Sequence, residues 1–160
     1  ANIACACGAT LHHVKPHGAL YNLAASDPAV AQAVAQAVAS VDPRLILVGL
    51  AESALTAAGV ALGLPVAHEA FVDRAYHADG TLRPRSLPGA VHSDPTQAIG
   101  QALALASGQP FAAYTGQPLR RRADTLCIHG DTPQAIPFAQ ALRAALHNAG
   151  IVLAAPNLQR

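Results

Sequence analysis

Three short apolar runs of this 160-residue sequence are each followed by polar residues whose side chains could carry out chemistry. The runs occupy residues 11–14, a segment beginning at 65–67, and residues 125–128. The groups that follow them offer general acids and bases, cations for a developing oxyanion, and carboxylates that orient the others or bind a metal. These candidate catalytic residues are Lys15, His17, Glu69, Asp73, Arg74, His129 and Asp131.

These side chains can meet only if the apolar runs are strands of one parallel sheet. Short apolar runs alternate with longer Ala-, Leu- and Val-rich segments of helical period, which is typical of βα units. The carboxyl ends of parallel strands lie on one face of such folds, and active sites are built there. The sequence therefore predicts an α/β protein in which Lys15, His17, Glu69 and His129 face one cavity.

Capping and turn residues set the expected elements. Asp27 and Asp94, each followed by proline, predict helices over 28–40 and 95–107. We further expect a helix over 52–58 ended by Gly59, a helix over 132–150, and strands at 45–48, 111–114 and 151–154. Residues 71–92 show neither the helical nor the strand period of apolar residues, so we expect a long ordered loop, called the excursion below. A loop of that length tends to be functional or mobile.

Each candidate residue also has a structural interpretation, which the sequence leaves open. Asp131 precedes Thr132 and Pro133, so it can simply cap a helix. A histidine at a strand end is more often a structural residue than a catalytic one. Lys15 is the strongest single candidate, because it is the only lysine beside nine arginines. A solvated cation in such a sequence would be arginine, so a lone lysine indicates a task for a compact ammonium group.

Composition argues against several classes of protein. The formal net charge is +1, which gives no broad electrostatic footprint for nucleic acid or an anionic membrane. No apolar run approaches the roughly 20 residues of a membrane helix, and no leader pattern is present, so we expect a cytoplasmic protein. The three cysteines lack paired spacing, which favours reduced thiols over a disulfide framework or a zinc site.

Several segments of the chain resemble the LamB/YcsF family. The most distinctive is residues 14–22, VKPHGALYN. Further matches are residues 69–76 (EAFVDRAY), 79–80 (DG), 88–90 (PGA) and 127–133 (CIHGDTP). Their order and spacing follow the family from Thr10 to Leu153, which makes the resemblance far more specific than any single motif.

The resemblance implies a seven-stranded (β/α) barrel akin to the glycoside hydrolase/deacetylase barrels. It also implies a component of the three-subunit, ATP-dependent 5-oxoprolinase, which hydrolyses 5-oxo-L-proline to L-glutamate with ATP cleavage. The implied partners are 5-oxo-L-proline and the two other subunits, the implied cofactor is ATP, and a divalent metal is left open. Because the sequence has no Walker-type phosphate loop, ATP binding by this chain rests on the resemblance alone.

Two alternatives stay open at this point. One is a metal-dependent hydrolase or deacetylase of the same barrel superfamily, for which only His17, His129 and Asp131 are visible as ligands. The other is a noncatalytic scaffold that binds partner subunits. Metal analysis distinguishes the first alternative, and activity measured with and without the partners distinguishes the second.

The start of the chain departs from the family pattern. In the family, a segment like residues 1–5 (ANIAC) continues into a Gly-Phe-His-Ala-Gly-Asp-like turn, and many residues then precede the Lys-Pro-His motif. Here Lys15 follows Cys5 within ten residues, and the family's initial Asp-Leu-Gly-Glu-like strand is absent. We therefore expect residues 1–160 to form a single incomplete barrel domain that lacks its N-terminal part, with a chain break near residues 5–6. The missing segments would carry further site residues.

Overall fold

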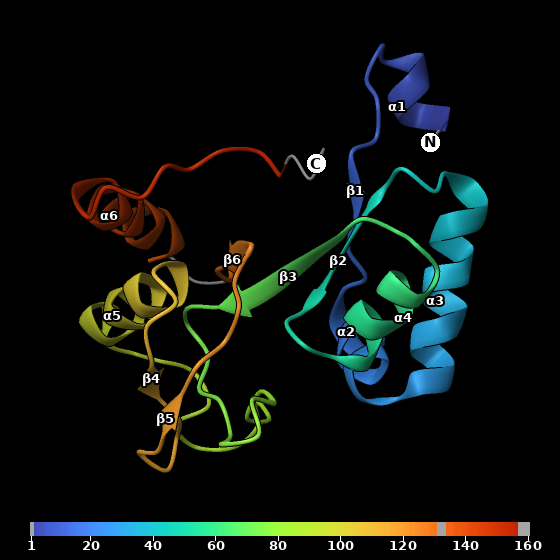
Figure 1. Cartoon of the computed structure of the whole chain (residues 1–160). Coiled ribbons are helices and arrows are strands. Elements are labelled where there is room, and N and C mark those ends of the chain that lie inside the picture. The colour runs from blue at the N-terminus through green and yellow to red at the C-terminus, as the bar shows by residue number, and fades with distance from the viewer. Residues whose placement is uncertain (1, 131–133, 157–160) are drawn as a thin grey trace. The chain divides into compact units, whose positions relative to one another are not determined.

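The computed structural model describes residues 2–130 and 134–156 of the chain (Figure 1). Within them, residues 2–68 and 69–156 form two compact units. Strand β3, Val66–Phe71, begins in the first unit and ends in the second. The strand order is β1 (His13–Val14), β2 (Ile46–Leu50), β3 and β6 (Thr125–Cys127), and the β1–β2 and β3–β6 pairings are parallel. The α/β class predicted from the sequence is thereby confirmed.

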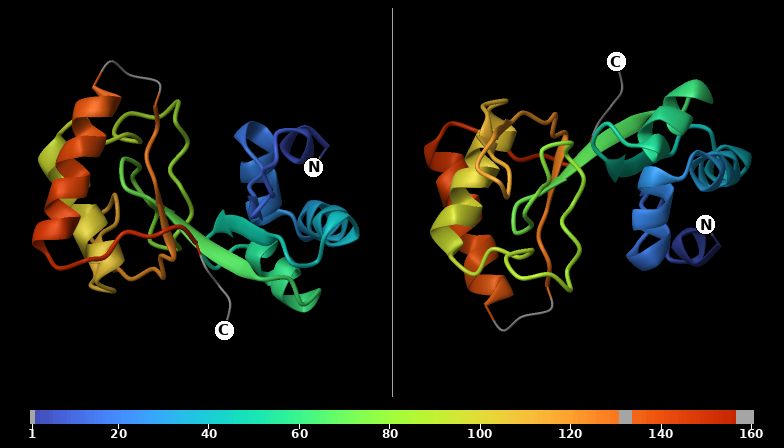
Figure 2. Two further views of the ribbon diagram at one scale, coloured as in Figure 1. Left: turned by 90° about the horizontal axis from the view of Figure 1, so that it is seen from above. Right: turned by 90° about the horizontal axis from the view of Figure 1, so that it is seen from below.

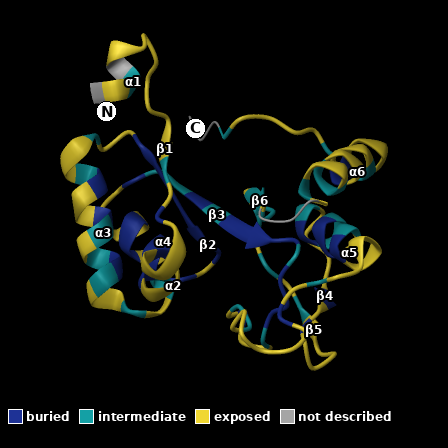
Figure 3. Cartoon of the chain, turned by 180° about the vertical axis from the view of Figure 1, so that it is seen from behind, coloured by how far each residue is buried: buried dark blue, intermediate teal, exposed yellow. Residues whose placement is uncertain are grey.

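The first unit packs helices against buried strands. All five residues of β2 are buried (Figure 3). Leu45, Leu47 and Leu55 form the centre of its core, together with alanines of the surrounding helices. Its elements are α1 (Asn2–Ala6), β1 (His13–Val14), α2 (Gly18–Ser26), α3 (Pro28–Val41), β2 (Ile46–Leu50) and α4 (Ala54–Ala61).

The helix N-termini of the first unit show where a capping residue in the sequence predicts the start of a helix and where it does not. Asp27 caps α3 as predicted, since its carboxylate accepts hydrogen bonds from the backbone N–H groups of Ala29 (2.8 Å) and Val30 (3.2 Å). Helix α2 has no such signal, because its N-cap residue His17 makes no side-chain capping bond. Capping residues alone therefore do not predict α2.

The prediction that Gly59 ends a helix is wrong. Gly59 lies inside α4, and the chain reverses only at Gly63, which has a φ of +72°. A Cβ atom on Gly59 would stand 2.8 Å from Val66 Cγ2 and 2.9 Å from Leu47 Cδ2. Gly59 is therefore needed for the close approach of α4 to the strands, and a pattern of helix-breaking residues cannot distinguish this role from a helix stop.

We expect alanine at Gly59 and at Gly100 to change stability in opposite directions. At Gly59, overpacking should cost about 1–3 kcal/mol, which exceeds the gain of about 0.5–1 kcal/mol from replacing a helical glycine. Gly100 lies in a helix with nothing within 4 Å of an added Cβ, so Gly100→Ala should only stabilise. Chemical denaturation of both variants measures the change in the free energy of unfolding, which should fall for Gly59→Ala and rise for Gly100→Ala. Equal stabilisation by both would refute the packing role of Gly59.

The second unit contains two packed helices and the short parallel pairing of β3 with β6. Helices α5 and α6 lie side by side (Figure 2), and their core consists of Val72, Ala102, Leu142 and Leu146. The elements are α5 (Pro95–Ala106), β4 (Phe111–Ala112), β5 (Pro118–Leu119), β6 (Thr125–Cys127) and α6 (Ala135–Asn148).

Among the described residues, none of the helices has the length and apolar character of a membrane span.

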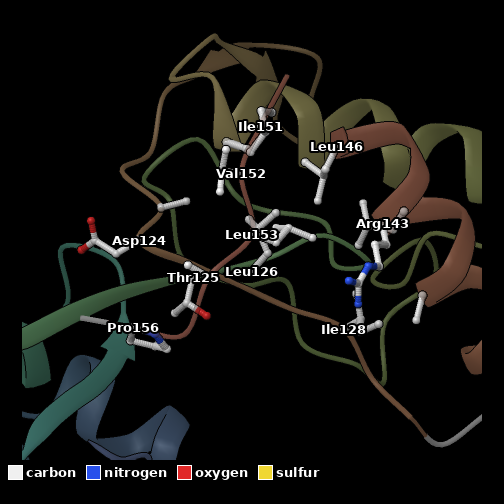
Figure 4. Close-up of a pocket in the computed structure, with 15 residues that line it drawn as sticks. Asp124, Thr125, Leu126, Ile128, Arg143, Leu146, Ile151, Val152, Leu153 and Pro156 are labelled. Carbon is white, nitrogen blue, oxygen red and sulfur yellow. The ribbon is translucent and has the colours of Figure 1, made fainter. Parts of the chain in front are cut away.

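The prediction of a final strand at residues 151–154 is wrong, since these described residues belong to no strand. They line an apolar cavity of about 390 Å³ beside β6 and the end of α6 (Figure 4). Val152 is 88% exposed. An apolar run indicates a tendency to be buried but does not specify a neighbouring strand. The predicted start of α6 at Thr132 lies outside the described residues.

Candidate active site

The excursion between β3 and α5 is held together by a buried arginine. Arg74 is 6% exposed, and its guanidinium donates to the carbonyl oxygens of Ala90 (3.2 Å) and Arg83. Burial, and then the positive charge of Arg85, lower the pKa of Arg74. The structure therefore gives Arg74 a role in ordering residues 71–92, and its part in the chemistry stays a prediction.

Asp73 and His129 meet because of the register between β3 and β6. Phe71 lies opposite Cys127, and each of the two site residues follows two positions later. Asp73 Oδ2 lies 2.7 Å from His129 Nδ1, and it also accepts the backbone N–H of His129 at 3.2 Å. Both side chains are largely buried, with exposed fractions of 13% for Asp73 and 25% for His129. Parallel pairing thus joins two residues that are 56 positions apart.

This geometry fixes how the His129 imidazole can act. An ionised carboxylate only accepts hydrogen bonds, so Nδ1 of His129 must donate to Asp73, which leaves Nε2 to exchange protons. The Phe71 ring stacks on the imidazole, with centroids 5.6 Å apart and planes 23° apart. An oriented imidazole backed by a carboxylate is suited to general acid–base catalysis.

The pair opens into a cavity of about 290 Å³ within the second unit. Arg85 and His92 add a cation and a second imidazole to its lining. Ligand pockets for drug-sized molecules start at roughly 300 Å³, so this cavity fits a small metabolite. The larger cavity of Figure 4 has no histidine and is lined mainly by residues such as Leu126 and Leu146, so we place the candidate active site at the smaller one.

Glu69 is a buried residue within β3 and does not lie at a strand end. The prediction that Glu69 follows its strand is wrong, because β3 continues to Phe71, and Glu69 pairs with Thr125 of β6. Glu69 is only 3% exposed. Nearby, the Tyr76 hydroxyl accepts the backbone N–H of Phe71 at 2.7 Å. Burial raises the pKa of Tyr76, and the charge of Glu69 acts in the same direction.

The remaining predicted residues are Lys15, His17 and Asp131. Lys15 is exposed, with Nζ 5.7 Å from the centre of the Tyr21 ring, within the range of a cation–π contact. His17 is the N-cap of α2 and precedes Gly18, which has a φ of +62°. Lys15 and His17 belong to the first unit, so their convergence with Glu69 and His129 stays a prediction. Asp131 lies outside the described residues.

The donor set for a metal-dependent hydrolase is not assembled in the described residues. No three His, Cys, Asp or Glu side chains gather among them. Asp73 and His129 supply two potential ligands that bind each other, and Asp131 is not described. Zinc sites of catalytic type need three protein ligands. We therefore assign no step of the chemistry to a metal.

Sequence reasoning missed one buried polar residue beside the site. Gln101 is 7% exposed and lies on the buried stripe of α5 formed by Ala98, Ala102 and Leu105. A buried amide must find hydrogen-bond partners or destabilise the fold. Its position on an apolar stripe is the signal that could have identified it.

The Asp73–His129 pair lies just beyond the carboxyl ends of two parallel strands. Active sites of parallel α/β proteins are found at this position, so the fold and the site define a protein of this class. The profile of the LamB/YcsF family matches residues 1–159. The chain belongs to the LamB/YcsF family, as its motifs predict.

Similar proteins extend this assignment. The chain is 54% identical over 156 residues to the 5-oxoprolinase A subunit of Chloroflexus aggregans, covering 98% of this chain and 62% of that protein. It is 51% identical over 148 residues to the 5-oxoprolinase A subunit of Brevibacillus brevis, covering 92% and 58%. The crystal structure of the lactam utilization protein from Thermus thermophilus superposes with a TM-score of 0.88 at 43% identity, covering 97% and 62%. The chain thus spans about three-fifths of the length of these relatives.

Proposed function

We propose that this chain acts as part of the A subunit of an ATP-dependent 5-oxoprolinase, which hydrolyses 5-oxo-L-proline to L-glutamate. The Asp73–His129 pair, with its 2.7 Å contact at a small cavity, is the observation that carries the proposal. The relatives, which are named as 5-oxoprolinase A subunits and as a lactam utilization protein, support the substrate class.

The chemistry explains why such a pair is useful. A five-membered lactam is an unstrained, resonance-stabilised amide, so phosphorylation of its carbonyl oxygen by ATP activates the carbon toward water. In the proposed step the water oxygen bonds to that carbon while His129 Nε2 takes the proton. The C–N bond then breaks, and the proton passes to the ring nitrogen. Asp73 stabilises the imidazolium between the two transfers. A second water hydrolyses the resulting acyl phosphate to L-glutamate and phosphate.

The proposal extends to the complete enzyme. We place this chain in a single-domain, seven-stranded (β/α) barrel of the glycoside hydrolase/deacetylase type, working in the cytoplasm with two partner subunits. Family membership and the parallel β1–β2 and β3–β6 pairings support the barrel. ATP is the co-substrate of the assembled enzyme in this proposal, and no phosphate-binding loop is assigned to this chain.

A coupled assay for glutamate formation from 5-oxoproline and ATP tests the proposal. The chain is combined with its two partner subunits, and each component is then omitted in turn. We expect glutamate only when all three are present. Full activity without this chain would refute the proposal. Full activity with a His129→Gln chain would favour the scaffold alternative, and activity that follows metal content would favour the metal-dependent one.

A further inference from the structure

A single side chain binds the backbone on both sides of Asp73. The side-chain nitrogen of Gln101, on α5, lies within hydrogen-bond distance of three carbonyl oxygens of the segment that leaves β3, so one of its two N–H groups is shared between two acceptors. The acceptors are the carbonyls of Phe71 (2.8 Å), Val72 (3.3 Å) and Arg74 (2.9 Å). Because this segment leaves the strand to enter the excursion, Gln101 satisfies carbonyls that the β3–β6 ladder does not continue to pair.

His92 binds the one carbonyl of this segment that Gln101 does not. The backbone N–H of His92 donates to the carbonyl of Asp73 at 2.9 Å. The His92 ring is also hydrogen-bonded to Gln101, with Nε2 3.1 Å from Gln101 Oε1. Carbonyls can only accept, so the amide nitrogen of Gln101 must face them and its oxygen must face His92. Nε2 of His92 therefore carries a proton, and the neutral ring has its lone pair at Nδ1.

We propose that Gln101 is the positioning residue of the Asp73–His129 pair, and that His92 holds Gln101 in its working orientation. All four carbonyls of residues 71–74 accept hydrogen bonds from these two residues. Together these bonds fix the backbone that directs the Asp73 carboxylate toward His129. The kinetic consequence rests on the proposed function, whereas the geometric consequence does not.

Two measurements on the full chain test this positioning role. The first is the low-field proton NMR signal of His129 Nδ1–H, which the short contact with Asp73 deshields and which His129→Gln assigns by its loss. The second is glutamate formation by the chain assembled with its partner subunits. Gln101→Met keeps the length of the side chain and removes its donors. We expect Gln101→Met to shift or broaden the signal and to lower kcat about 10- to 100-fold, with KM changed much less.

Matched variants separate positioning from general stability. Gln97→Met alters an exposed glutamine one turn earlier on α5, and it should leave the signal and kcat unchanged. His92→Phe removes the ring contact with Gln101 and also the second imidazole of the cavity lining, so only its effect on the His129 signal is used, as the second test if Gln101→Met does not fold. It should shift the same signal by a smaller amount. An unchanged His129 signal in folded Gln101→Met, or in His92→Phe if Gln101→Met does not fold, would overturn the proposal. If Gln101→Met shifted the signal but the wild-type chain, assembled with its partner subunits, did not turn over 5-oxoproline, the positioning role would be supported and the proposed function refuted.

Discussion

Replacing His129 with glutamine is expected to lower the rate of glutamate formation from 5-oxoproline about 100- to 10,000-fold, the usual contribution of a general acid–base group. Glutamine can still donate toward Asp73 but cannot exchange a proton with water or with the ring nitrogen. Because the effect lies in the chemical step, kcat should fall far more than KM changes. Steady-state kinetics of the assembled enzyme measure both parameters.

His147→Gln is the matched control for this variant. His147 lies in the last turn of α6, in the same unit, and is exposed. It should leave kcat within about twofold of the wild-type value, since surface substitutions away from a site have little effect. If His129→Gln behaved like His147→Gln, the Asp73–His129 pair would have no part in the reaction.

Replacing Lys15 with methionine is expected to lower kcat about 100-fold or more, corresponding to about 2–4 kcal/mol for loss of one group that stabilises a developing oxyanion. Methionine keeps most of the bulk of the stem and deletes only the charge. The buried Pro16 fixes the backbone beside Lys15, and Gly18 adopts the left-handed conformation that a tight turn requires. We therefore expect the ammonium group to be held in place while it stabilises charge on the lactam oxygen.

Arg44→Met is the control for Lys15. Arg44 is also an exposed cation of the first unit, with 88% of its side chain accessible beside Asp42, so its loss changes the net charge equally. It should leave turnover near the wild-type value. If Lys15 merely packs on Tyr21, then Lys15→Met should lower Tm and leave turnover per folded molecule near normal. That result would remove Lys15 from the active site.

The parts of the fold that could be predicted from the sequence are those with local causes. Helices α3 and α5 begin where an aspartate precedes a proline, because the carboxylate accepts the first free N–H groups within three residues. The fully apolar run of β2 likewise predicts a strand buried on both faces. Asp73 and His129 could be expected near strand ends, but their contact also depends on the register between β3 and β6.

The parts that could not be predicted depend on contacts between distant segments. Gln101 resembles an ordinary helical residue until the carbonyls of residues 71–74 are seen beside it. Gly59 resembles a helix stop until Leu47 and Val66 are found against it. The position of Glu69 is mispredicted because an acidic residue in a strand gives no local sign that β3 continues past it.

The register of β3 and β6 has a consequence for how the chain folds. Side chains alternate between the two faces of a strand, so a slip of one residue would turn His129 away from Asp73. A buried acceptor left without its donor costs about 1–3 kcal/mol, and each mispaired arrangement of these strands would carry that penalty. The correct arrangement gives Asp73 Oδ2 both of its donors on His129. The Asp73–His129 contact therefore also favours the correct strand pairing, and we expect its loss to lower the yield of correctly refolded protein as well as turnover.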